Sequence, residues 1–335
     1  MRFDFYSGPM TNLEVRPVPE LCDLVPSRGP VVELHEARDV PLGGVRAMRV
    51  RRTLPQRALP MVGAWCFLDE FGPQHVDMRV LPHPHTGLQT VTWPVAGEIL
   101  HRDSVGSEAV VRPGQLNLMT AGHGVSHSEF SLGSEPLLHA VQLWVALPDG
   151  VADGAPGFVQ VSGLPVWDAP RARATVFVGD LDGSWSPARV HTPLLGADVV
   201  VDPGADVEIP LVRGFEHAVL LLSGTAEVAG TPHTTSGLLY LGDGRDHVRV
   251  RSRDGARLLL LGGAPFAHDL VMWWNFVGRT HADIAQARAE WESDDRAERF
   301  GVVAGHDGAR IPAPELPNIR LQPRRRLPRT PQENP

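Results

Sequence analysis

Two short sequence patterns contain the residues that are best suited to chemistry. They are His83-Pro84-His85 and His127-Ser128-Glu129, and in each the two outer residues are separated by a single position. Residues at positions i and i+2 of a β-strand lie on the same face of the sheet. Two such strands side by side would aim three imidazoles and one carboxylate at a common point. Three neutral nitrogens and one anionic oxygen suit a divalent transition metal such as Fe(II), Mn(II), Co(II), Ni(II), Cu(II) or Zn(II).

The alternative to a metal site is a chance pairing of histidines, because the chain has 15 of them. The joint arrangement favours the metal site. The first pattern comes just before an alternating stretch, Thr90–Val95, and a glycine turn at Gly97, and the second follows the elbow Gly122-His123-Gly124. Paired strands lie about 4.8 Å apart, which is close enough for ligands with bonds of about 2.0–2.2 Å to share one ion.

Composition describes an ordinary globular protein. The chain has 335 residues, of which 42% are hydrophobic and 21% charged, and its net charge of −8 offers no general attraction to nucleic acid. Cys22 and Cys66 do not form a CxxC pair, so they provide no thiolate metal site, although one disulfide between them stays open. We find no signal peptide in Met1–Met10 and no apolar run of about 18 residues. We therefore expect a cytoplasmic protein that does not enter a membrane.

The distribution of turns predicts an all-β fold. From Val31 to about Ala146 short alternating stretches are separated by glycine and proline turns, and the whole chain contains 34 Gly and 31 Pro. Such even spacing is typical of a β-barrel or a β-sandwich.

A second segment, about Phe158–Ala264, repeats this rhythm, and Leu211–Gly224 aligns with Pro84–Gly97 without gaps. The repeat suggests two barrels in tandem. The second barrel lacks the metal set and is expected to be structural or to bind a partner. Its residues at the corresponding positions are Pro210, Val212, Val250 and Ser252, while Glu216, His217 and His247 leave a residual polar site as the less favoured alternative.

The end of the chain is predicted to be helical and then disordered. Thr280–Asp283 resembles a capping box and opens a helix that extends to about Glu292. Within this helix Ile284, Ala287 and Trp291 share one face, which we expect to pack against the second barrel. The predicted organisation is a metal-binding barrel over residues 31–148, a second barrel plus helix over 149–292, and a disordered tail rich in proline and arginine over 313–335.

Other titratable residues near the patterns have simpler interpretations. His101 and Asp103 share a face with each other on one strand, and we favour a solvated outer face with an ion pair to Arg102 or Arg112. His123 is either a proton carrier at the mouth of the metal pocket or a surface histidine, and the sequence leaves both open.

Several segments closely resemble the pirin family of the cupin superfamily. The most specific are Leu81–Thr92, His101–Ser104 and Met119–Glu129. Further similar segments are Phe67–Pro73, His139–Val145 and Val271–Val277, so that the resemblance covers about residues 45–300.

The resemblance implies a bicupin, in which two β-barrels face each other and only the first usually holds a metal. It implies that His83, His85, His127 and Glu129 are the metal ligands and that the metal is iron. Two residues depart from the common family pattern. Glu70 replaces a histidine, and Gln89 replaces a glutamate, where it could still form a hydrogen bond behind the ligands but could not act as a base.

Some pirins resemble quercetin 2,3-dioxygenases in activity. The resemblance therefore implies an iron-dependent dioxygenase, in which the metal and Glu129 assist deprotonation of a flavonol-like substrate. The alternative is a redox-responsive regulatory protein that binds a protein partner through a surface sensitive to the iron state. A third interpretation is a metal-stabilised scaffold without turnover.

Overall fold

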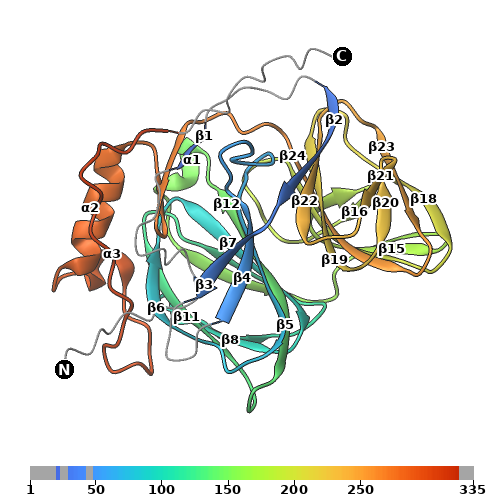
Figure 1. The fold of residues 1–335 in the computed structure, drawn as a ribbon. Coiled ribbons are helices and arrows are strands. Elements are labelled where there is room, and N and C mark those ends of the chain that lie inside the picture. Colours follow the sequence, from blue (N-terminus) through green and yellow to red (C-terminus); the bar gives the residue numbers. More distant parts are fainter. Residues whose placement is uncertain (1–19, 23–28, 43–47, 324–335) are drawn as a thin grey trace, which may run out of the picture.

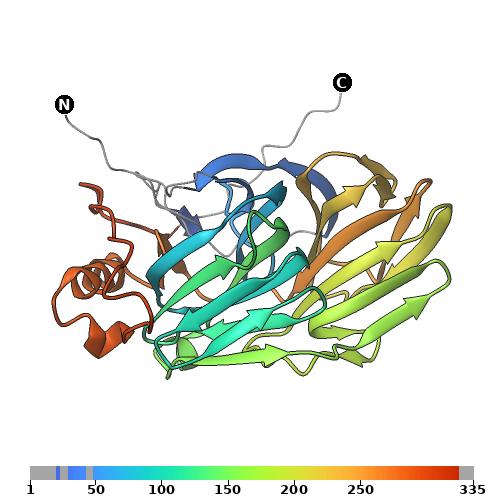
Figure 2. The same cartoon turned by 90° about the horizontal axis from the view of Figure 1, so that it is seen from below.

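The structure, a computed structural model, describes residues 20–22, 29–42 and 48–323. They form two pairs of packed β-sheets that lie side by side, with α2 and α3 against the first pair on the side away from the second (Figure 1). Figure 2 shows the same halves as neighbouring layered sheets. The helices are α1 (Asp149–Ala152), α2 (His281–Glu292) and α3 (Ala297–Phe300).

The first half consists of a seven-stranded and a four-stranded sheet. In spatial order the larger sheet contains β13 (Gly157–Val161), β10 (Leu116–Thr120), β7 (Leu88–Ala96), β12 (Leu137–Ala146), β5 (Trp65–His75), β4 (Met48–Leu54) and β3 (Arg38–Leu42). The smaller sheet contains β6 (Arg79–His85), β11 (Val125–Ser131), β8 (Ile99–Asp103) and β9 (Glu108–Val111).

The second half repeats this arrangement. Its larger sheet contains β14 (Val166–Ala169), β15 (Ala172–Leu181), β17 (Leu194–Val201), β24 (Ala256–Gly263), β19 (Glu216–Gly224), β22 (Gly237–Gly242) and β2 (Pro30–Glu36), with β16 (Ser184–Trp185) paired to β15. Its smaller sheet contains β18 (Ala205–Pro210), β23 (His247–Ser252), β20 (Ala226–Val228) and β21 (Thr231–His233). Among the described residues, hydrogen bonding does not close either pair into a continuous barrel, so each half is two packed sheets.

The two halves exchange strands. The strand β2, near the start of the chain, pairs with β22 of the second half, whereas β13 pairs with β10 of the first half. The boundary predicted between residues 148 and 149 is therefore crossed by one strand in each direction.

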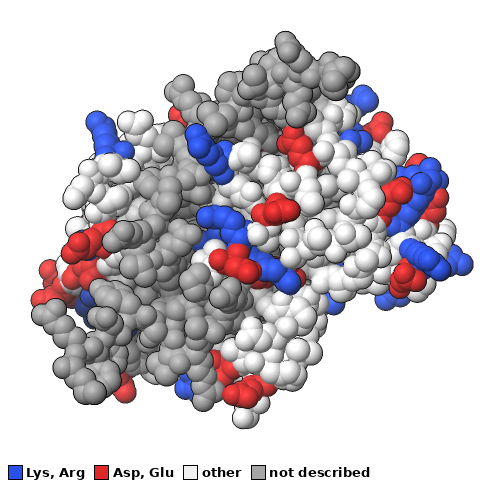
Figure 3. Space-filling model, in the orientation of Figure 1, with Lys and Arg blue, Asp and Glu red and all other residues white. Residues whose placement is uncertain are grey.

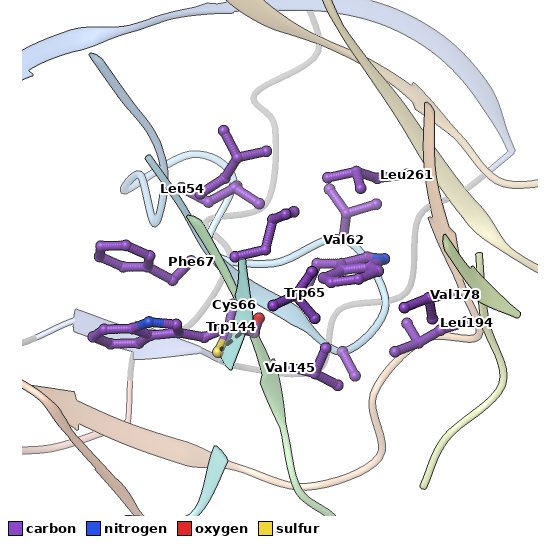
Figure 4. Packing of buried hydrophobic residues seen from close by; sticks show 14 of the residues in the cluster. Leu54, Val62, Trp65, Cys66, Phe67, Trp144, Val145, Val178, Leu194 and Leu261 are labelled. Carbon is purple, nitrogen blue, oxygen red and sulfur yellow. Dashed lines mark hydrogen bonds between the residues drawn. The ribbon is translucent and has the colours of Figure 1, made fainter. Parts of the chain in front are cut away.

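A shared hydrophobic core joins the halves. Figure 4 shows Trp65 of β5 lying between its own strand and Leu194 and Leu261 of the second half. The indole N–H of Trp65 donates to the carbonyls of Leu195 and Gly262, both at 3.1 Å. The backbones approach so closely here that a Cβ on Gly63 would lie 2.6 Å from the Cα of Gly263. The contact therefore requires glycine.

Strand β7 is buried on both of its faces. Val91 and Trp93 point into the shared core, while Thr90 and Thr92 point into the first half, and all four are buried. The prediction of a strand here is confirmed, because β7 spans Leu88–Ala96.

The helix after the barrels packs differently from the prediction. The boundaries of α2 and its buried face of Ile284, Ala287 and Trp291 are confirmed, and the capping box at Thr280 is present. The partner is not the second half, however. A three-stranded sheet of β1 (Glu20–Cys22), β25 (Leu270–Trp273) and β26 (Phe276–Gly278) returns the chain to the first half, and α2 packs on β25 and β26. The predicted partner of α2 was wrong because the chain returns to the first half after residue 264, and no local sequence pattern indicates this return.

The proline-rich tail is ordered over the part that is described. In residues 313–323 Ala313 and Leu321 are buried in the cluster that contains α2, and the carbonyl of Pro314 accepts a hydrogen bond from Arg288. The predicted disorder from residue 313 is therefore wrong up to residue 323, because apolar side chains between the prolines find a surface to cover. Residues 324–335 lie outside the described residues.

The cysteines, the helices and the surface charge can also be compared with the sequence. Cys66 is a free buried thiol, so the two cysteines do not form a disulfide. In the described part of the chain, no helix combines the length and apolar character needed to cross a membrane. On the face shown in Figure 3, acidic and basic side chains are interspersed and form no broad basic patch.

Candidate metal centre

The two sequence patterns lie on neighbouring strands. The strands β6 and β11 are antiparallel, with His83 opposite His127 and His85 opposite Val125. A register shift between His127 and Glu129 interrupts the ladder at that point. The predicted strand pairing thus brings the patterns together at one end of the smaller sheet.

Three imidazoles converge at this point. One donor nitrogen from each of His83, His85 and His127 lies within 4.8 Å of the other two, and all three side chains are buried. The Nε2 atoms of His85 and His127 are 3.1 Å apart. Two nitrogens that bind one ion at about 2.1 Å lie roughly 3.0–3.4 Å apart. The spacing therefore fits donors to a shared cation.

Backbone carbonyls determine which nitrogen of two histidines faces the site. The Nδ1 atoms of His83 and His85 lie 2.9 and 3.2 Å from the carbonyl oxygens of Leu81 and Asn275. A carbonyl only accepts, so each Nδ1 carries the proton and each Nε2 presents a lone pair to the site. The Nε2 of His83 is buried without a hydrogen-bond partner. A buried lone pair without a donor is costly, and a metal cation would satisfy it.

Burial keeps these imidazoles neutral. It lowers the pKa of His83 to about 3, and it lowers the pKa values of His85 and His127 well below the usual value, with the neighbouring histidines acting in the same direction. Metal ligation needs unprotonated imidazole. Near neutral pH the site therefore meets this requirement without displacing protons from the nitrogens that face it.

Glu129 lies beside this set. Its carboxylate forms a second, overlapping group with His101 and His127, again with the donor atoms within 4.8 Å of one another. Thr92 donates a hydrogen bond of 2.9 Å to its Oε1, and burial raises the pKa of the carboxyl group. A nearby cation would favour ionisation of this carboxyl. The structure thus brings the three predicted histidine ligands together and places the predicted carboxylate at their edge.

His101 and Asp103 were placed wrongly by the sequence analysis. Both point inward and are buried, at 1% and 3% exposure, and His101 lies against His127. The expected ion pair from this face to Arg102 or Arg112 does not form, because Arg102 pairs with Glu108 and Arg112 with Glu98. The available signal was Ile99, which shares the inward face of β8 with both residues.

The two residues that differ from the common family pattern, Gln89 and Glu70, form their hydrogen bonds and ion pairs with groups other than His83, His85 and His127. The amide of Gln89 donates to Thr120 Oγ1 of its own half at 2.9 Å and to the Arg189 carbonyl of the second half at 3.2 Å. It therefore forms no hydrogen bond behind the ligands. Glu70 pairs with His139 at 2.9 Å and with Arg51 at 2.7 Å.

His123 is exposed on the outer surface, where its Nδ1 lies 3.0 Å from the carbonyl of Gly154. This position matches the surface alternative for His123.

The second half has an apolar interior at the equivalent place. Its smaller sheet contributes Val207, Ile209, Val248 and Val250 to a hydrophobic cluster. Glu216 instead bonds the Gly63 amide and the Tyr240 hydroxyl, and His247 is exposed beside Asp246. Among the described residues, the groups of three or more metal-binding side chains both lie in the first half.

A small cavity opens beside the histidines. It is lined by the polar side chains of His85, His127, Glu129, Asp69 and Gln142 and by an apolar wall of Val50, Phe67, Phe71 and Trp144. The space accessible to the centre of a water molecule is about 10 Å³. That is roughly enough for one water. The cavity as it stands admits a molecule of the size of O2 or water.

Comparison with known protein families assigns both halves. The family model described as Pirin matches residues 45–145, and the model described as Pirin C-terminal cupin domain matches residues 196–298. This chain belongs to the pirin family. Its mostly β fold with two cupin domains and a short C-terminal helix is the fold predicted from the resemblance.

Individual relatives agree over most of their length. PA1205 of Pseudomonas aeruginosa, named provisionally as a quercetin 2,3-dioxygenase, is 45% identical over 319 residues, which are 92% of this chain and 98% of that protein. A crystal structure of quercetin 2,3-dioxygenase from Acinetobacter baumannii is 40% identical, with a TM-score of 0.82 over 86% of this chain and 96% of the other. The bacterial pirin YhhW from Escherichia coli, solved in complex with nickel(II), shares the fold at 18% identity and a TM-score of 0.55, over 70% of this chain and 100% of the other.

Proposed function

We propose that this pirin is an Fe(II)-dependent dioxygenase that acts on a flavonol-like substrate. The observation that supports the proposal most strongly is the buried set of three neutral imidazoles that opens, beside Glu129, into a cavity with an aromatic wall. The names of the relatives from Pseudomonas and Acinetobacter point to the same reaction class.

The roles of the residues follow from their positions. His83, His85 and His127 would hold the ion, with Glu129 as the fourth ligand. A bound Fe(II) would supply open coordination positions for O2 and for a substrate oxygen. Glu129 would accept the proton of a substrate hydroxyl, because it is the carboxylate that lies beside the three histidines. Thr92 orients that carboxylate by its hydrogen bond to Oε1.

The cavity determines what must move. Phe67 and Trp144 stack at 4.0 Å between ring centroids, and the guanidinium of Arg52 lies 4.5 Å from the centre of the Phe67 ring while it pairs with Asp69. These contacts make one wall rigid. A fused-ring substrate therefore enters only if other apolar side chains of the lining, such as Val50 and Phe71, are displaced.

The test is aerobic incubation of the purified protein with quercetin after loading with Fe(II), Mn(II), Co(II), Ni(II) or Cu(II). We expect flavonol absorbance to fall together with O2 uptake, and His127→Ala to abolish both. His123→Ala, a surface histidine variant, is the matched control and keeps the activity. No loss of flavonol with any of the metals would reject the proposal.

A second candidate function is regulation through a protein partner, and the tightness of the cavity favours it. A site with room for about one water can bind a metal without turnover. The carbonyl of Asn275 contacts His85, and Asn275 lies between β25 and β26, the two strands on which α2 packs. A shift of His85 on a change at the metal would therefore be passed through this turn to α2. Co-purification from the native host distinguishes the candidates. A stoichiometric partner whose affinity changes with iron oxidation state would support regulation.

A further inference from the structure

A row of buried side chains leads away from the candidate metal centre. His127 on β11 and His101 on β8 lie with their Nδ1 atoms 3.4 Å apart, and His101 Nε2 lies 3.0 Å from Asp103 Oδ2. The two strands are paired, with His127 opposite Asp103 and Glu129 opposite His101. The row therefore starts at a proposed ligand and ends at a carboxylate.

The carboxylate is held in place from its other side. Asp103 Oδ1 accepts hydrogen bonds from the amides of Val105 and Ser107, at 3.0 and 2.9 Å. Burial acts to raise the pKa of Asp103, but the hydrogen bonds from His101 and Ser107 hold the pKa below its usual value. An ionised carboxylate only accepts hydrogen bonds. Asp103 therefore requires a proton on His101 Nε2.

The proton positions along the rest of the row follow from that end. When its single proton is on Nε2, His101 presents the Nδ1 lone pair to His127. Because two lone pairs would repel, His127 carries its own proton on Nδ1 and donates it to His101. The Nε2 of His127 is then left unprotonated and faces the Nε2 of His85. The face of the His101 ring stacks on Phe158, 4.5 Å away with an angle of 16°, which fixes the plane of the ring.

We propose that Asp103 and His101 act as a positioning relay that fixes the proton of His127 on Nδ1 and so prepares its Nε2 to bind metal. The inference rests on the metal centre of the proposed function. The relay leaves the proton of His127 on Nδ1. The carbonyls of Leu81 and Asn275 do the same for His83 and His85. His101 is then a positioning residue and not a ligand.

The alternative is an ion held by His101, His127 and Glu129, whose donor atoms also lie close together. A neutral His127 has one lone pair and can serve only one of the two groups. The group with His83 and His85 is favoured, because both of those nitrogens already face the site and His83 Nε2 has no other partner. The test below separates the two.

The decisive variant is Asp103→Asn. Asparagine keeps a carbonyl oxygen for the amides of Val105 and Ser107, but it presents an NH2 group to His101. The relay then reverses, since His101 must accept at Nε2 and donate from Nδ1, and His127 is left with its proton on Nε2. We expect the affinity for Ni(II), measured by titration calorimetry, to fall about 10- to 100-fold, the range seen when residues behind metal ligands are replaced. The unfolding temperature of the metal-free protein should stay close to that of the wild type.

Replacement of His101 separates positioning from ligation. The amide of His101→Gln can accept from His127 and donate to Asp103, so we expect nearly wild-type Ni(II) affinity. His101→Leu can do neither and should match Asp103→Asn. If His101 were a ligand, both variants would lose metal to the same extent as His127→Ala, and this result would overturn the relay.

Nuclear magnetic resonance can locate the ring protons directly in the wild-type protein. Nitrogen-15 NMR of the histidine rings in the metal-free protein should show His127 protonated on Nδ1 and His101 on Nε2, and Asp103→Asn should reverse both. Glu70→Gln is the matched control, because it changes another buried carboxylate–histidine pair, with His139 at 2.9 Å, and should leave Ni(II) affinity unchanged.

Two outcomes overturn the relay directly: a wild-type His127 protonated on Nε2, or an Asp103→Asn variant that folds and binds Ni(II) like the wild type. Retention of Ni(II) by His83→Ala and His127→Ala would instead reject the metal centre itself, and with it the proposed function.

Discussion

At the scale of single residues, the first half keeps histidines neutral by burial and aims them by hydrogen bonds. His83 and His85 use backbone carbonyls, and His127 faces another histidine. A hydrogen bond at Nδ1 of each of the three histidines leaves the Nε2 atom to face the candidate metal site. The chemistry proposed for the site therefore depends on the groups behind the three histidines as much as on the histidines themselves.

His85→Ala removes one of the three converging nitrogens. We expect the Ni(II) content after equilibrium dialysis, measured by elemental analysis, to fall to background, because two histidines and a carboxylate bind far less tightly than the full set. His123→Ala should retain the metal. Unchanged metal content in His85→Ala would exclude this residue from the ligand set.

The buried histidines also predict how stability depends on pH. Burial lowers the pKa of His83 to about 3 and the pKa values of His85 and His127 well below normal, whereas the unfolded chain takes up these protons near pH 6.5. Between these limits the unfolded state binds more protons, so the free energy of unfolding falls as pH is lowered below about 6.5. The slope is at most about 1.4 kcal/mol per pH unit for each histidine.

Urea unfolding of the metal-free protein between pH 7.5 and pH 5 measures this slope. His83→Gln should reduce it, because one of the titrating groups is gone. A free energy of unfolding that stays constant over this range would show that the three imidazoles do not remain neutral in the folded protein.

At the scale of elements, local sequence patterns predicted where strands and helices form but not which other elements they pack against. Alternation located β7, and the capping box with its apolar stripe located α2. The partner of α2 and the inward direction of His101 depend on how the chain returns after residue 264 and on which face of β8 is covered. These are long-range outcomes, and a local period of two or 3.6 residues carries no information about them.

The helix α2 makes its main contact through Trp291. The ring lies edge-on to Phe300, with centroids 5.5 Å apart, and the indole N–H donates to the Ile311 carbonyl at 2.9 Å. Trp291→Ala should lower the free energy of unfolding in urea by about 3–5 kcal/mol. Gln286→Ala, on the exposed face of the same helix, should change it by less than about 0.5 kcal/mol. Equal effects of the two variants would mean that the stripe is not a packing surface.

At the scale of the whole molecule, the two halves are joined by shared contacts. They share the core around Trp65, and Trp93 donates its indole N–H to Asp198 of the second half at 2.8 Å. The first half also depends on β13 and on the Asn275 carbonyl, which both come from later in the chain. The proposed metal centre therefore depends on residues from both halves.

A fragment of residues 31–148 tests this dependence. It lacks β13 and exposes the face of β7 that carries Val91 and Trp93. We expect it to show no cooperative unfolding transition by calorimetry, whereas the full chain should unfold in one transition. A sharp transition in the fragment would show that the first half is an independent domain.

The pairing of β2 with β22 has a consequence for synthesis on the ribosome. The last residue of β2 is Glu36 and the first of β22 is Gly237, so 237 − 36 gives a separation of 201 positions. At about 5–20 residues per second, the emerging strand waits roughly 10–40 s for its neighbour to be translated. During that interval the backbone amides and carbonyls of β2 that later pair with β22 are open to other nascent chains.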